Sequence, residues 1–160
     1  MITVISIISV ALAVVFLMIT CLGVSGFGIW YMLVDLPSFI MLAIFVIPIV
    51  CISGFGKDFM KAFQISDKKK ETTLVQLNRS IEAVNLVIRT LLYGGAFTTL
   101  FSFIMMFQAM AQPEYVLEAK TLFINFGVAM LTMLYALAFC LLLFPVSAAL
   151  KRKKIDYVQE

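Results

Sequence analysis

The sequence predicts an all-α membrane protein with four transmembrane helices, the third of which extends into the cytoplasm. Hydrophobic residues make up 63% of the 160 residues and charged residues only 13%. Soluble domains are usually about 45–50% apolar and about 25% charged. The apolar residues also fall into four runs separated by turns or polar stretches. A chain of this size has room for one membrane domain and no separate soluble domain of ordinary size, so we treat residues 1–160 as a single unit.

Residues 2–22 form the first expected span. They contain no charged side chain, and at about 1.5 Å per residue they can cross roughly 30 Å of hydrocarbon. A secretory signal peptide has a basic start, which is missing here, so we expect the span to remain uncleaved. Residues 23–30, GVSGFGIW, then form a turn whose aromatic residues suit the membrane interface.

The second expected span covers residues 37–55. Pro37 suits the first turn of a helix, where a missing N–H group costs nothing. Pro48 lies deeper and predicts a kink, because proline removes a helical hydrogen bond. Gly54 and Gly56 mark the end of the span.

Residues 57–89 are the one sizeable polar stretch, which we expect in the cytoplasm. Apolar residues recur in it at helical spacing, and the pattern runs without a breaker into the third span, residues 90–111. We therefore predict one continuous helix from near Thr72 to near Ala111, about 60 Å long.

The fourth expected span, residues 121–150, follows a short loop at 112–120 and precedes a basic tail at 151–160. At about 45 Å the span exceeds the hydrocarbon thickness and should tilt or protrude. The excess of Lys and Arg lies in 57–89 and in the tail, so the positive-inside rule places both in the cytoplasm, together with both termini.

Spans three and four each have one face of small and weakly polar residues. These faces comprise Gly95, Thr98, Thr99 and Ser102 in span three, and Asn125, Ala129, Thr132 and Ala136 in span four. Such faces let membrane helices pack closely. They can equally line a path for an ion, because hydroxyl oxygens can replace its water. The pattern alone leaves both interpretations open.

No acidic or basic residue lies within any expected span. A proton or Na⁺ relay would therefore need a titrating group from a partner chain, with the hydroxyl face beside it. The lack of intramembrane charges and of broken helices in matched repeats argues against a self-contained transporter. The chain has no His, and its three Cys lie in apolar runs without metal-ligand spacing. We therefore expect no enzyme activity, no cofactor, no bound metal and no nucleic-acid partner.

Three stretches are similar to those of a known family. They are VDLPSFIML at residues 34–42, GAFTTLFSFI at 95–104, and AMLTMLYALAFCLLLFPVSAALK at 129–151. In order, spacing and topology the sequence resembles the MotA/TolQ/ExbB family, the A subunits of ion-driven membrane motors and energy transducers. The layout is most similar to the flagellar stator branch.

The resemblance implies a ring of five A subunits around a dimer of a single-span, MotB/ExbD-like B subunit. The B subunit's transmembrane Asp would face spans three and four, and passage of H⁺ or Na⁺ would drive rotation in the bacterial inner membrane. By this likeness Thr99 belongs to the ion path and Thr132 is a second candidate, beside the hydroxyls of Thr98 and Ser102. Pro145 would permit a helix bend. The expected packing residues are Gly95, Ala129, Tyr135 and Ala136.

The sequence departs from the family pattern in three respects. Met133 stands where the family has a second Thr, span three lacks a proline near its cytoplasmic end, and the cytoplasmic segment is far shorter than in flagellar members. Flagellar motility is the leading expectation for the process driven. A TolQ/ExbB-like energy transducer for an envelope process and a non-conducting membrane scaffold are the alternatives.

Overall fold

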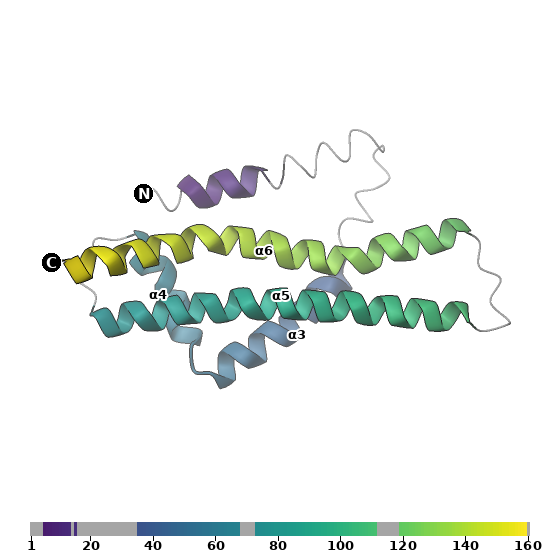
Figure 1. Ribbon diagram of the computed structural model, residues 1–160, viewed down its shortest axis with the longest axis horizontal. Coiled ribbons are helices and arrows are strands. Elements are labelled where there is room, and N and C mark those ends of the chain that lie inside the picture. Colours follow the sequence, from purple (N-terminus) through teal and green to yellow (C-terminus); the bar gives the residue numbers. More distant parts are fainter. Residues whose placement is uncertain (1–4, 14, 16–34, 68–72, 112–118, 160) are drawn as a thin grey trace.

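The computed structural model describes residues 5–13, 15, 35–67, 73–111 and 119–159. Within these residues helices are the only regular secondary structure, which confirms the all-α prediction. Four helices follow a short N-terminal helical piece (Figure 1), and their bounds are α3 Leu36–Ile52, α4 Gly56–Asp67, α5 Leu74–Met110 and α6 Ala119–Gln159.

Two of the described helices, α5 and α6, are long and apolar enough to cross a membrane. The pair α3–α4 would provide a third crossing if it is counted as one broken span. The chain is thus a helical membrane protein. Of the first expected span, only residues 5–13 and 15 are described. The turn at 23–30 and most of the loop at 112–120 lie outside the described residues.

The predicted long helix is present as α5, with 37 residues and a length of about 55 Å. It begins two residues after Thr72 and ends one residue before Ala111, so the prediction is confirmed almost to the residue. An apolar stripe explains its N-terminal part, because Leu77, Ile81 and Val84 repeat at helical spacing and are all buried.

Helix α6 is longer than predicted. It has 41 residues and continues through the basic tail to Gln159, whereas the expected span stopped at residue 150. Lys and Arg are good helix formers, and their charges favour the C-terminal end of a helix. The tail is also held from the side, because Leu150 is fully buried and the Lys153 ammonium donates a hydrogen bond to the Ile65 carbonyl.

Helix α3 begins as predicted, with Pro37 in its first turn, and it contains Pro48. It ends at Ile52, and Gly54 adopts a φ of +71°, which favours glycine. The chain turns there by 96° into α4. The expected cytoplasmic stretch 57–89 is therefore two elements, α4 and the start of α5.

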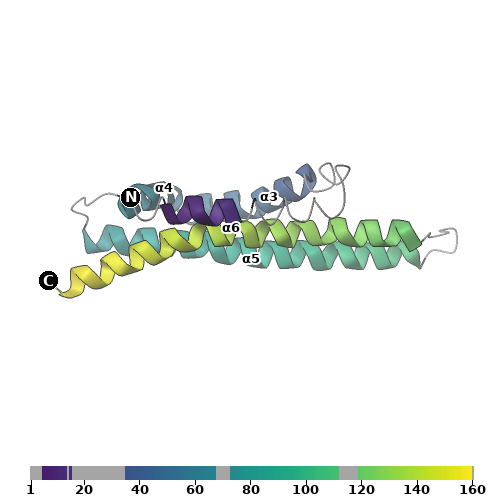
Figure 2. The same ribbon diagram turned by 90° about the horizontal axis from the view of Figure 1, so that it is seen from above.

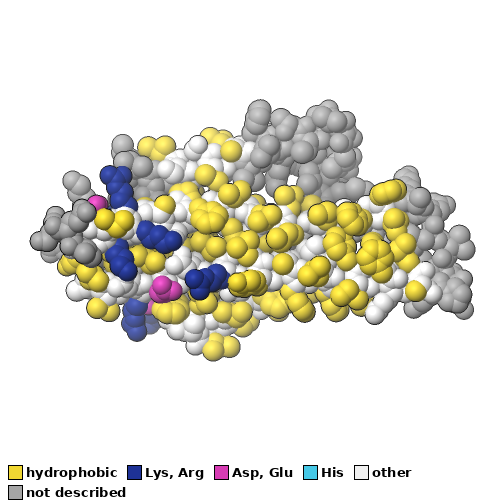
Figure 3. Space-filling view, in the orientation of Figure 1, with side chains coloured by type: hydrophobic (Ala, Val, Ile, Leu, Met, Phe, Trp, Pro, Cys, Tyr) yellow, Lys and Arg dark blue, Asp and Glu magenta, His cyan; other side chains and the backbone are white. Residues whose placement is uncertain are grey.

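The molecule has two layers. Helices α5 and α6 run side by side and antiparallel, and α3 and α4 lie on one side of this pair (Figures 1 and 2). Gly95 marks a close approach within the pair: a Cβ atom added to it would lie 2.6 Å from the Ala136 Cβ. In Figure 3, the Lys and Arg side chains on the visible face gather at the end of the molecule that holds α4 and the C-terminus, and most of the rest of that face is hydrophobic.

A hydroxyl-lined cavity as candidate functional site

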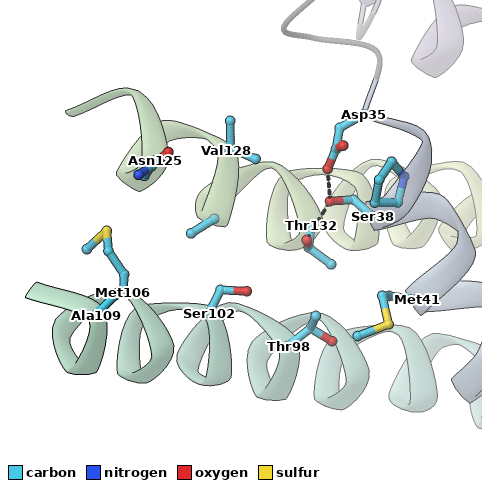
Figure 4. Close-up of a pocket in the computed structure, with 12 residues that line it drawn as sticks. Asp35, Ser38, Met41, Thr98, Ser102, Met106, Ala109, Asn125, Val128 and Thr132 are labelled. Atoms are coloured by element: carbon cyan, nitrogen blue, oxygen red, sulfur yellow. Dashed lines mark hydrogen bonds between the residues drawn. The ribbon is translucent and has the colours of Figure 1, made fainter. Parts of the chain in front are cut away.

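A cavity of about 450 Å³ opens between α3, α5 and α6, beyond Gly95 on the side away from the basic end (Figure 4). Six polar residues from the three helices contribute to its lining: Asp35, Ser38, Thr98, Ser102, Asn125 and Thr132. The space exists because the neighbouring positions are small. Ala129 and Thr132, for example, stand where large aliphatic side chains would fill the gap.

A chain of hydrogen bonds runs along one wall. The Ser38 hydroxyl donates to the Asp35 carboxylate, and the oxygens of Ser38 and Thr132 are 2.7 Å apart (Figure 4). Ser38 has a single hydroxyl proton, which goes to Asp35, so the Thr132 hydroxyl is the donor in the second bond. The carboxylate thus ends a relay of two hydroxyls that connects α3 to α6.

Asp35 is the residue before α3, but its side chain forms no capping bond with the helix. The side chain turns to Ser38 instead, one helical turn away. The backbone N–H of Asp35 donates to the Tyr135 hydroxyl at 3.1 Å, and the Tyr135 ring stacks on Phe39 with centroids 4.3 Å apart. The carboxylate is therefore fixed to α6 through Thr132 and Tyr135.

The opposite wall belongs to α5. Thr98 is buried, and its hydroxyl donates to the Gly94 carbonyl at 2.6 Å. Its proton is therefore occupied, and its oxygen lone pairs are left to accept a hydrogen bond or to contact a cation. Ser102 lies one turn further along the same face and is half-buried.

The structure brings only part of the predicted ion path together. Thr98, Ser102 and Thr132 all line the cavity, whereas Thr99 does not. Thr99 is one turn beyond Gly95 on the face packed toward α6. It is buried, and its hydroxyl has no hydrogen-bond partner among the residues that the structure describes. The Thr99 hydroxyl thus lies within the packed contact between α5 and α6.

The remaining predicted residues lie along α6 or against it. Ala129 lines the cavity, Ala136 contacts the Gly95 backbone region, and Tyr135 bonds Asp35. Pro145 lies inside α6, which continues through it without a break. Figure 2 shows the yellow C-terminal part of α6 inclined to its green part.

The position of Asp35 on the cavity was not predicted from the sequence. No acid lies within an expected span, so a carboxylate beside the hydroxyl face was expected from a partner chain. Asp35 stands just before α3, and the start of that helix lies against the middle of α6, so the chain places its own carboxylate on the cavity. The available signal was the spacing Asp35-x-x-Ser38 at a helix start, which allows the two side chains to meet.

The cavity has the chemistry of a site for a small monovalent cation or a proton. One carboxylate can balance one positive charge, and hydroxyl oxygens can replace water around an ion. No protein-family model, curated protein sequence or solved structure matches this chain.

Proposed function

We propose that this chain is the ion-handling A subunit of a membrane motor or energy transducer in the bacterial inner membrane, with H⁺ or Na⁺ as the coupling ion. The observation that supports it is the relay Asp35–Ser38–Thr132 on the wall of a cavity between three helices. Ionisable side chains at membrane depth are costly and usually mark ion or proton pathways.

The relay suggests how the ion is handled. A proton reaching Asp35 neutralises the carboxylate and gives it an O–H group that can donate to the Ser38 oxygen. The Ser38 hydroxyl is then free to donate to Thr132 instead, so the direction of the relay reverses. Sodium would instead be held by the carboxylate together with hydroxyl oxygens from Ser38, Thr98 and Thr132.

The assembly follows from the resemblance to the MotA/TolQ/ExbB family. Five copies would surround a B-subunit dimer whose transmembrane Asp exchanges ions with the cavity. Large apolar side chains such as Phe97, Phe101 and Phe126 are exposed on α5 and α6 and must contact lipid or neighbouring subunits. By the positive-inside rule we propose that the basic end faces the cytoplasm and that both termini are cytoplasmic. Flagellar motility is the proposed output, and an envelope process driven by a TolQ/ExbB-like transducer is the alternative.

Ion flux through membrane vesicles tests the proposal. The chain is produced together with a candidate single-span B subunit, and uptake of H⁺ or Na⁺ is followed with a fluorescent indicator. We expect Asp35→Asn to abolish the flux and Thr132→Val to reduce it at least tenfold. Thr99→Val is the matched control, because it removes a hydroxyl that does not line the cavity.

Normal flux in both Asp35→Asn and Thr132→Val would overturn the ion-handling role. Loss of flux in Thr99→Val alone would mean that the ion path runs through the α5–α6 contact and not through the cavity. Particle images without five-fold symmetry would overturn the ring while leaving the ion site intact.

A non-conducting scaffold is the second candidate, and the close contact of Gly95 with Ala136 favours it. In a scaffold the small residues serve helix packing alone. Asp35→Asn should then leave assembly and cell function unchanged, while Gly95→Leu should abolish both.

A further inference from the structure

A second cavity of about 290 Å³ lies between α5 and α6 in the basic half of the molecule. Arg89 and Asn85 line it from α5, and Phe144, Ser147 and Lys151 line it from α6. It shares no residue with the hydroxyl-lined cavity and has no place in the proposed ion path.

The two cations of this cavity stand at the boundary of the apolar zone. Residues 90–110 of α5 and 121–150 of α6 contain no charged side chain. Arg89 and Lys151 are the first charges beyond these two stretches, and the helices are antiparallel. Because both residues line one cavity, the two boundaries coincide in space, as they must where both helices leave the hydrocarbon on the same side.

Neither cation is neutralised within the part of the chain that the structure describes. Arg89 and Lys151 are exposed and form no ion pair with any described residue. The two uncharged polar side chains that line the cavity bond to each other, since the Ser147 hydroxyl donates to the Asn85 side-chain oxygen at 3.3 Å. The exposed Phe144 ring, which belongs to the apolar stretch 121–150 of α6, provides an apolar wall on the hydrocarbon side.

We propose that this cavity binds the phosphate group of an anionic phospholipid from the cytoplasmic leaflet. The Arg89 guanidinium fits a phosphate in two-point contact, and the Lys151 ammonium adds a point charge. Phe144 contacts the first segment of an acyl chain. The occupant is a lipid and not a soluble phosphate compound because the phosphate-binding cations stand directly beside an apolar wall at membrane depth.

Lipid retention measured by native mass spectrometry tests the assignment. The full chain is reconstituted in nanodiscs of equal parts phosphatidylglycerol and phosphatidylcholine, released, and weighed with its bound lipids. We expect selective retention of phosphatidylglycerol. Removing both charges in Arg89→Gln/Lys151→Gln should lower that retention well over tenfold, since each cation that donates a hydrogen bond directly to the phosphate contributes about tenfold or more to the affinity.

The matched control is Arg152→Gln/Lys154→Gln, which removes the same charge from exposed positions of the same tail. It should retain phosphatidylglycerol nearly as the parent does. Equal losses in both double variants would mean general attraction of charges to the membrane and would overturn the site. Retention of phosphatidylcholine as strong as that of phosphatidylglycerol would also overturn it.

A competition with inorganic phosphate separates lipid from free phosphate as the source of the phosphate group. If millimolar phosphate displaces the retained phosphatidylglycerol, and Phe144→Ala leaves retention unchanged, the cavity belongs to a soluble ligand and the lipid assignment is wrong. If phosphate fails to compete and Phe144→Ala weakens retention, the assignment stands.

Discussion

The two halves of the α5–α6 pair are packed in opposite ways. In the basic half, residues 74–95 of α5 and 136–159 of α6, large aliphatic side chains are buried beside the smaller cavity of about 290 Å³, and Leu77, Val84, Val146 and Leu150 are at most 1% exposed. In the open half, residues 96–110 and 119–135, small and hydroxylated residues leave a cavity of about 450 Å³.

One half of the helix pair therefore contributes mainly to stability, and the other half holds the polar groups of the cavity. Burial of aliphatic side chains stabilises the basic half, because tight packing and removal of apolar surface from water act together there. The open half lacks that packing, and its hydroxyls and one carboxylate line a cavity large enough for an ion. Gly95 lies where the two halves meet.

Leu77→Ala should produce the largest effect on stability. The side chain is fully buried in the part of α5 that precedes Arg89, so its removal should cost about 2–5 kcal/mol of unfolding free energy. Denaturant titration in detergent, followed by circular dichroism, measures this cost. Met106→Ala, which borders the open cavity, is the control and should cost clearly less. Equal costs would contradict the contrast between the halves.

Gly95→Ala should come next, at about 1–3 kcal/mol, because the added methyl group meets the rigid Ala136 Cβ atom. The neighbouring substitution Gly94→Ala is the control, since its methyl group would meet only ordinary contacts with Phe45 at 3.4 Å. Thermal unfolding compares the two variants. The double variant Gly95→Ala/Ala136→Gly should recover part of the loss, and a complete lack of recovery would place the strain elsewhere.

Tyr135→Phe should cost about 0.5–1.5 kcal/mol, because it takes the acceptor from the Asp35 N–H group while leaving the ring stacked on Phe39. Tyr157→Phe removes a hydroxyl from an exposed ring of the same helix and should be neutral. The same denaturant titration measures both. A neutral Tyr135→Phe would show that the Ser38–Thr132 bond and the ring stacking suffice to hold the start of α3 against α6.

Thr99→Val should have the smallest effect and the opposite sign. The Thr99 hydroxyl is buried and has no partner in the described part of the chain, so an apolar group of the same shape should leave stability unchanged or raise it by up to about 1 kcal/mol. A loss of more than 1 kcal/mol, seen in parallel thermal and denaturant experiments, would mean that the hydroxyl does find a partner in the assembled protein.

The sequence predicted best what depends on local pattern. The limits of α5 followed from an unbroken apolar stripe, and the start of α3 followed from Pro37. The 96° turn could not be predicted, because Gly54 shows where a chain can turn but not in which direction the next helix leaves. That direction depends on the packing of Ala62 and Ile65 of α4 in the core.

The part of the site that depends on local pattern was also predicted. Helical spacing placed Thr98 and Ser102 on one face, and both line the cavity. The spacing also placed Thr99 on this face, and the family resemblance assigned it to the ion path. Thr99 does not line the cavity, because neighbouring positions on a helix differ by about 100° in direction. Asp35 was missed because its position depends on how α3 lies across α6, a contact between residues 100 positions apart.

Arg89 and Lys151 lie at the same end of the apolar stretches of α5 and α6, and this limits how the helix pair can move across a membrane. A piston stroke along the membrane normal would drag at least one of these charges into hydrocarbon, at a cost of about 2.5–3.5 kcal/mol for each. Tilting, or turning about the long axis of the hairpin, leaves both charges at the surface. In the proposed motor, work would therefore be delivered sideways or as torque, and not as a thrust through the bilayer.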